Sequence, residues 1–195
     1  MVVGRGAVRP RRRLTSPDRH DGVHILAISG SLRTRSSNTA LVHAARLIAP
    51  AGTTVEIYAD LAELPHFNPD LDADGAIPPP PVAELREALR SADAVLISSP
   101  EYAHGVPGAL KNALDWVVGT GELMSKPIAV INTSTRSEFV TTQLVETLTV
   151  MMGQVVIATA LPVDGRAMDA AAIAADPELG ESLRAIVATL SDAVR

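Results

Sequence analysis

Residues 23–38 read VHILAISGSLRTRSSN, an apolar run that ends at a glycine and continues into a polar loop. A short apolar run bounded by turn residues is typical of a strand that is buried on both faces of a parallel sheet. Beyond the loop, apolar residues recur at helical spacing until Pro50 and Gly52 end the pattern. The stretch therefore predicts a strand, a loop and a helix in succession.

The same alternation continues along the chain and predicts an α/β fold. Five buried strands separated by helices are expected to form one doubly wound five-stranded parallel sheet with helices on both faces. In such sheets, ligands bind beyond the carboxyl ends of the strands, so the loops after the first, third and fourth strands are the candidate site. The expected strands are 23–29, 53–58, 94–99, 127–132 and 154–158; the expected helices are 38–49, 82–91, 107–118, 137–152 and 177–194, with a proline-rich loop over 59–81.

The composition fits one globular domain and excludes several kinds of chemistry. The chain has 195 residues, of which 47% are hydrophobic and 20% charged, and it has no cysteine. Disulfides, thiolate metal sites and thiol nucleophiles are therefore excluded. The five histidines are scattered without metal-ligand spacing, so no metal site is expected.

Charge is distributed unevenly between the first residues and the rest. Residues 1–22 hold six arginines and two aspartates, whereas the remaining residues hold 11 basic and 20 acidic side chains. We expect a disordered basic leader over 1–22 and a folded domain over 23–195; a nucleic-acid tail is the alternative interpretation of the leader. The acidic domain predicts no nucleic-acid binding, and no apolar run approaches the length of a membrane span. A cytoplasmic location is expected.

The loop after the first strand has the composition of a phosphate site. Gly30 allows a tight turn, the free N–H groups of the following helix attract anions, and Arg33 adds a positive charge. The loop lacks the glycine-rich patterns of dinucleotide and ATP loops. The alternative is that a serine or Asn38 only caps the helix while the arginines are solvated. The candidate phosphate ligands are Ser31, Arg33, Ser36, Ser37 and Asn38.

Two motifs together resemble a known family. The pattern G-S-L-R-x-x-S-x-N spans residues 30–38, and residues 100–116 read PEYAHGVPGALKNALDW. Both are similar to segments of the NADPH-dependent FMN reductase family, which includes quinone, azo-dye and chromate reductases. The second segment is the more specific because the match is long. With the order of the strands, the resemblance covers about residues 23–160.

The resemblance implies a flavodoxin-like fold and an FMN site. The first loop would hold the FMN phosphate. The flavin ring would lie against residues from the second and third loops, where Ala103 replaces a common asparagine and residues 132–136 lack the family's glycine. His104 is either a solvated or substrate-facing histidine or a proton donor. The residues implied around the ring are Pro100, Glu101, Tyr102, Ala103 and His104. Thr133, Ser134 and Arg136 are further candidate donors to flavin oxygens, and another helix cap is the alternative.

The implied activity is NAD(P)H-dependent oxidoreduction. Hydride would pass from NADPH (or NADH) to the flavin and then to flavin, quinone or another small acceptor, with no catalytic side chain required. The alternatives are a flavodoxin-like electron carrier and a flavin-binding protein without pyridine-nucleotide activity. The family also implies a homodimer or homotetramer, for which Trp116, Val117 and Val118 offer apolar surface. Lys111, Asn112, Asp115 and Trp116 are expected to lock their helix against the sheet or a partner, with Trp116 in the core or at an interface.

Overall fold

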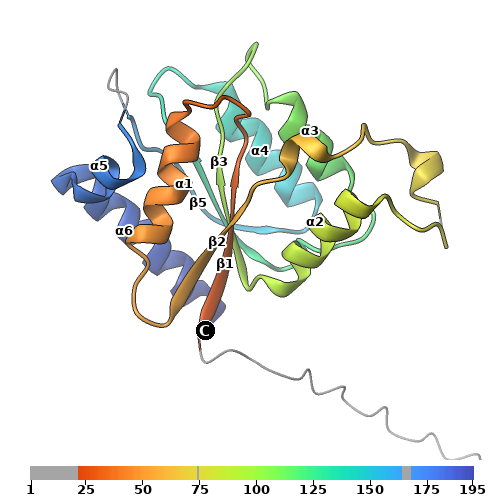
Figure 1. The fold of residues 1–195 in the computed structure, drawn as a ribbon, viewed down its shortest axis with the longest axis horizontal. Helices are drawn as coiled ribbons and strands as arrows, with labels where there is room; N and C mark the ends of the chain where they lie inside the picture. Colours follow the sequence, from red (N-terminus) through yellow and green to blue (C-terminus); the bar gives the residue numbers. More distant parts are fainter. Residues whose placement is uncertain (1–21, 74, 164–167) are drawn as a thin grey trace, which may run out of the picture.

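The computed structural model describes residues 22–73, 75–163 and 168–195. Its centre is one parallel sheet with strand order β2-β1-β3-β4-β5 (Figure 1). The predicted leader over 1–22 lies, apart from Gly22, outside the described residues. The strands are β1 (Val23–Ser29), β2 (Thr53–Tyr58), β3 (Ala94–Ser98), β4 (Pro127–Asn132) and β5 (Gln154–Ala160).

Helices cover both faces of this sheet, as predicted. Alternate residues of β1 point to opposite faces: Leu26 packs in one hydrophobic core with α2, α3 and α4, whereas Ile25 packs in a second core with α1 and α6. Figure 1 shows these two helical layers on either side of the sheet. The helices are α1 (Ser37–Leu47), α2 (Pro80–Ser91), α3 (Gly108–Asp115), α4 (Phe139–Val150), α5 (Ala170–Ala175) and α6 (Pro177–Val194), with 3-10 turns η1 (Leu61–Glu63) and η2 (Pro69–Leu71).

The structure differs from the predicted elements mainly at their ends. Helix α2 begins at Pro80, because prolines fit the first turn of a helix where no N–H donor is needed. Strand β5 continues to Ala160, and α3 ends at Asp115 rather than near Val118. Helix α5 was not predicted; it has six residues, five of them alanine, and therefore no amphipathic pattern.

Parallel pairing brings the three candidate loops to one edge of the sheet. The backbone N–H of Gly30, after β1, donates to the carbonyl of Ser98 at 2.8 Å. The N–H of Ser99, after β3, donates in turn to Ile131 of β4 at 2.9 Å. The loops that follow β1, β3 and β4 are therefore neighbours at the top of Figure 1.

The long connection after β2 packs against α3. The Asn112 side chain accepts a hydrogen bond from the N–H of Phe67 (2.8 Å) and donates to the carbonyl of Pro65 (3.0 Å). The Trp116 Nε1 donates to the same carbonyl at 2.8 Å, and its ring meets Phe67 edge-on with the ring centres 5.1 Å apart.

Among the described helices, none is long and apolar enough to cross a membrane.

Candidate cofactor-binding site

The loop after β1 is shaped by its own serines. The N–H of Ser31 donates to Ser29 Oγ, and Ser31 Oγ accepts from the N–H of Arg33, both at 3.3 Å. Ser36 Oγ accepts from the N–H of Thr39 at 3.3 Å and caps α1. Ser31 is buried, whereas Arg33 is exposed. The capping alternative is thus realised by Ser36, while Ser37 opens the helix and the Arg33 side chain stays accessible to a ligand.

Asn38 links this loop to β3. Its side chain is 5% exposed, and its Oδ1 accepts a hydrogen bond from Ser98 Oγ at 2.9 Å. The carbonyl oxygen of Asn38 is therefore occupied, and a hydrogen bond to a phosphate would have to come from its amide nitrogen. The sequence motif marked the residue but gave no sign of this structural contact.

Glu101, in the loop after β3, binds the N-terminus of α4. Its carboxylate accepts hydrogen bonds from the backbone N–H groups of Val140 (3.0 Å) and Phe139 (2.7 Å). These bonds, that of Val140 first, lower the pKa of Glu101 below its ordinary value; burial opposes the shift and nearby His104 assists it. The side chain is 12% exposed and so is directed into the protein. Any contact of Glu101 with a flavin would therefore be made by its backbone.

A tight turn follows at residues 102–105. Tyr102 and Gly105 exchange two backbone hydrogen bonds, of 3.1 and 3.0 Å. The two residues between them have positive φ, 50° at Ala103 and 58° at His104, as in a type I′ turn. The His104 ring lies edge-on to Phe139 at 4.4 Å, with its Nδ1 4.0 Å from the Glu101 carboxylate, and the side chain is 74% exposed. His104 thus stands at the surface beside the turn.

The loop after β4 is organised by Asn132, which sequence reasoning missed. This buried side chain accepts from the N–H of Ser134 (3.1 Å) and donates to Thr141 Oγ1 of α4 (2.9 Å). Ser134 Oγ in turn accepts from the N–H of Arg136 at 3.2 Å. The carbonyl of Thr133 accepts from Val163, and the Arg136 side chain is exposed. The position of Asn132, a polar residue at the end of the apolar strand β4, was the signal in the sequence that could have indicated this role.

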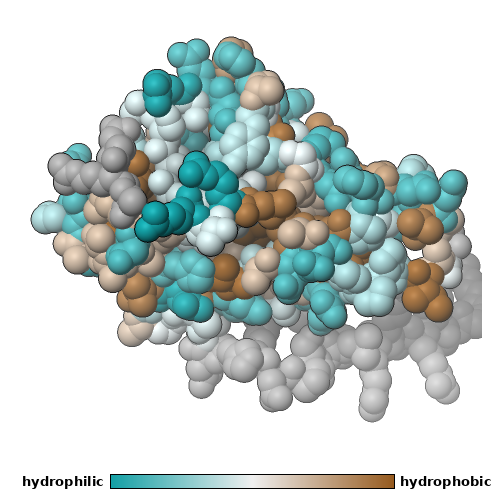
Figure 2. Space-filling view, turned by 45° about the horizontal axis from the view of Figure 1, so that its top comes forward, coloured by the Kyte–Doolittle hydropathy of each residue, from teal (hydrophilic) through white to brown (hydrophobic). Residues whose placement is uncertain are grey.

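The first and second loops meet around a hollow of about 320 Å³. Figure 2, in which the top of Figure 1 is turned forward, shows an apolar hollow with strongly hydrophilic side chains beside it. A Cβ at Gly30 would lie 3.0 Å from both Leu110 Cδ2 and Ser99 Oγ, so a larger residue there would displace these side chains, whereas Gly108 faces open space. The lining residues are Gly30, Leu32, Arg33, Tyr102, Pro107, Gly108 and Ala109.

The chain matches the family model described as NADPH-dependent FMN reductase over residues 23–167. It belongs to this family. It is 40% identical over 116 residues to an NAD(P)H-dependent FMN reductase of Pseudomonas aeruginosa, a match that covers 58% of this chain and 61% of the relative. It is 36% identical over 107 residues to a quinone reductase of Escherichia coli, covering 55% of each protein. The matches therefore span a little over half the length of these two relatives.

Solved structures support the flavodoxin-like fold of the family. The flavoenzyme FerB of Paracoccus denitrificans, described as an NAD(P)H:(acceptor) oxidoreductase, superposes with a TM-score of 0.69 and 29% identity, over 88% of this chain and 97% of that chain. An apo NADH:FMN oxidoreductase superposes with a TM-score of 0.61 and 19% identity, over 89% and 90% of the two chains, which shows the fold alone.

Two predictions about the FMN reductase motif are resolved by the geometry. Trp116 and Val117 are 0% and 1% exposed within this chain, so they are core residues and the prediction that they offer contact surface was wrong. Only Val118, 51% exposed, is accessible. Asn112 does lock its helix, but against the loop after β2 rather than against the sheet. The family's usual asparagine at position 103 suits a positive φ, which alanine tolerates less well.

Proposed function

We propose that the chain is an NAD(P)H-dependent, FMN-binding oxidoreductase that reduces flavin, quinone or another small acceptor. The observation that carries the proposal is the hollow between the first and second loops. Arg33 of the first loop and Tyr102 of the second line it together with Gly30 and Gly108. A cationic fork and free helix N–H groups suit a phosphate, and glycines suit a flat ring that approaches the backbone. The residues present thus fit FMN.

In this proposal the first loop holds the phosphate. Arg33 provides the charge, and the hydroxyls of the half-buried Ser36 and Ser37 and the backbone N–H groups at the start of α1 provide hydrogen-bond donors. Asn38 contributes through its amide nitrogen, because Ser98 occupies its carbonyl oxygen. The donors are Ser31, Arg33, Ser36, Ser37 and Asn38.

The second and third loops border the ring. Tyr102 is 46% exposed and lines the hollow. We assign the backbone of residues 100–104, in the loop after β3, to the polar edge of the ring. Thr133, Ser134 and Arg136, in the loop after β4, are assigned as further donors to the ring. FMN, when bound, supplies the electron transfer between nicotinamide and acceptor. The protein binds and orients the reactants, and no side chain is required as an acid or base.

We also propose that the protein is a homodimer or homotetramer in the cytoplasm. Two exposed apolar side chains, Val118 (51%) and Val150 (67%), line one shallow groove between α3 and α4. Apolar residues in such a position favour contact with another subunit. Light scattering at micromolar concentration tests the assembly: a monomer there contradicts it.

Flavin binding and reduction test the proposed function directly. The purified protein should bind FMN more tightly than riboflavin, because only FMN offers the phosphate; fluorescence titration measures both. Anaerobic NADPH or NADH should then bleach the bound FMN, and quinone should restore its absorbance. Equal affinity for riboflavin refutes the phosphate site. FMN binding without bleaching by either nucleotide makes the protein an electron carrier or a flavin-binding protein instead.

A further inference from the structure

The turn at residues 102–105 is held in a costly backbone conformation. Ala103 and His104 have φ values of 50° and 58°, in the left-handed region that residues with a Cβ adopt only at a cost in free energy. Such residues persist where contacts with the surrounding structure outweigh the cost, and they are concentrated at functional sites. The contacts that hold this turn therefore indicate what it positions.

One side chain of α4, that of Gln143, holds the turn from outside. Its Nε2 donates to the carbonyl of His104 at 2.9 Å, and its Oε1 accepts from the N–H of Val106 at 3.3 Å. The two partners lie 39 and 37 positions away in the sequence. A Cβ on Gly105 would lie 3.3 Å from the same Oε1, so the glycine leaves the amide room to reach both backbone groups.

The same helix also holds the start of this segment. Glu101 accepts from two backbone N–H groups in the first turn of α4, and Gln143 lies one helical turn further along. Residues 101–106 are therefore attached to α4 at both ends, with Tyr102 between the two attachments. The hydrogen bonds that Tyr102 and Gly105 exchange set the shape of the turn, whereas those of Gln143 set its position relative to α4.

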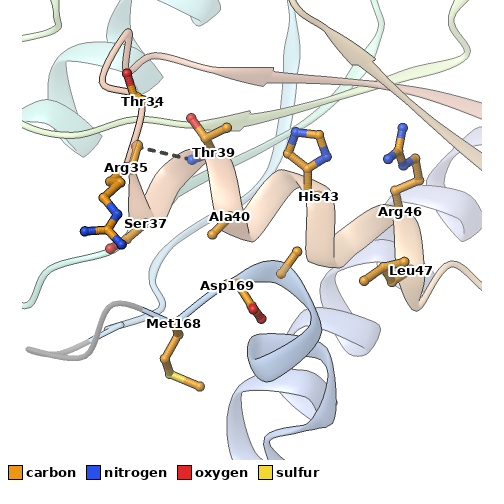
Figure 3. A pocket seen from close by; sticks show the side chains of 12 residues that line it. Thr34, Arg35, Ser37, Thr39, Ala40, His43, Arg46, Leu47, Met168 and Asp169 are labelled. Carbon is orange, nitrogen blue, oxygen red and sulfur yellow. Dashed lines mark hydrogen bonds between the residues drawn. The ribbon is translucent and has the colours of Figure 1, made fainter.

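Tyr102 lines the hollow between the first and second loops, whereas a larger pocket of about 570 Å³ lies along α1. That pocket is lined by residues from 34–47 and 168–170, and Figure 3 shows Met168 and Asp169 on its wall next to α5. A displaced turn would therefore change the hollow and leave the pocket along α1 as it is.

We propose that Gln143 is a positioning residue for the flavin ring. By fixing the turn to α4, it holds Tyr102 at the wall of the hollow, where the proposed function places the ring. Gln143 acts through the turn and needs no contact of its own with the cofactor. The inference rests on the proposed function. Loss of this side chain should weaken the contacts of the ring and leave those of the phosphate, which the first loop holds.

Binding of two flavins separates this role from phosphate binding. Gln143→Met keeps the length and helix propensity of the side chain but removes both hydrogen bonds. It should weaken FMN and riboflavin equally, about three- to tenfold, because a neutral hydrogen bond makes a modest net contribution. Thr142→Val, at the neighbouring exposed position of α4, is the matched control and should change neither affinity. Fluorescence titration measures both flavins with each protein.

A double-variant cycle tests whether Gln143 acts through Tyr102. Tyr102→Ala removes the side chain that the turn positions, so adding Gln143→Met to it should cause little further loss of flavin affinity. Amide hydrogen exchange of the flavin-free protein gives a readout that is independent of the cofactor. The N–H of Val106 should exchange faster in Gln143→Met than in Thr142→Val, because it has lost its acceptor.

Several results overturn the positioning role. They are flavin affinities or Val106 exchange in Gln143→Met equal to those in Thr142→Val, additive losses in the double variant, and a loss of affinity for FMN alone, which would assign Gln143 to the phosphate. If the wild-type protein binds neither flavin, the proposed function fails and this role with it. If it binds both and only Gln143→Met behaves like its control, the proposed function stands and the positioning role fails.

Discussion

The carboxylate of Glu101 accepts a hydrogen bond from the backbone N–H of Val140 at 3.0 Å, which joins the loop after β3 to the first turn of α4. The two residues are 39 positions apart in the sequence. Helix α4 has no side-chain cap of its own, since Glu138 at its N-cap makes no such bond. Glu101 therefore holds two of the three candidate loops in a fixed relation, because α4 directly follows the loop after β4.

This cap should make the protein sensitive to acid. The folded-state pKa of Glu101 is lowered, so the unfolded chain binds the proton more tightly. Its stabilising contribution is complete above the ordinary glutamate pKa of 4.5 and is lost as the pH falls through the lower folded value. Glu101→Gln should lower the free energy of unfolding at pH 7 and flatten its decline below pH 4.5. Urea denaturation at a series of pH values measures both.

Glu138→Gln is the matched control for this cap. It removes the same charge at the same helix end but no side-chain hydrogen bond to the helix. It should leave the free energy of unfolding nearly unchanged at pH 7. An equal loss in both variants would mean that negative charge near the N-terminus of α4, and not the cap, stabilises the helix.

The sequence was sufficient to predict the strands of the sheet, because burial on both faces leaves a continuous apolar run, as in VHILAIS over Val23–Ser29. The three candidate loops follow from the same pattern, since parallel strands put their carboxyl ends at one edge. Contacts between distant residues were not accessible in this way. The hydrogen bonds of Glu101 to α4 and of Asn112 to the loop after β2 depend on tertiary packing. A glutamate or an asparagine in the sequence does not indicate which distant residue it will bind.

The same limit explains why the sequence left both a core and an interface position open for Trp116. A large aromatic residue near a helix end fits a core or an interface equally well by pattern. Only the position of Pro65 and Phe67, 51 and 49 residues earlier in the chain, shows that the indole is enclosed by its own subunit.

A glycine at position 103 should stabilise the turn at residues 102–105. Ala103 has a φ of 50°, a left-handed conformation that costs a residue with a Cβ about 1 kcal/mol. Ala103→Gly should therefore raise the free energy of unfolding by up to about 1 kcal/mol. The same change in a right-handed helix, Ala188→Gly in the exposed middle of α6, should lower it by about 1 kcal/mol. Destabilisation by both substitutions would show that the turn is not held in this conformation.

Asn112 and Trp116 should be energetically coupled, because both donate to the carbonyl of Pro65. Asn112→Ala also leaves the N–H of Phe67 without its partner and should cost about 1–3 kcal/mol. Trp116→Phe loses one donor and should cost a similar amount. Only the double variant leaves the Pro65 carbonyl without either donor, so its cost should exceed the sum by about 0.5 kcal/mol or more. Circular dichroism must follow the unfolding, since Trp116 is the only tryptophan; additive costs would contradict the shared acceptor.

Substitution of Arg33 tests whether the hollow between the first and second loops holds the phosphate of FMN. Its exposed guanidinium lines that hollow opposite Tyr102, so Arg33→Ala should remove one charge-assisted contact and weaken FMN binding about ten- to a hundredfold. Riboflavin, which lacks the phosphate, should bind equally well to both proteins. Arg35→Ala is the matched control: it removes the same charge from the same loop, but Arg35 does not line the hollow, so the effect on FMN affinity should be smaller. Fluorescence titrations of the four protein–flavin pairs and of the control measure these affinities.

A loss of riboflavin affinity equal to the loss of FMN affinity would mean that Arg33 supports the loop itself. Unchanged FMN affinity would make it a solvated charge.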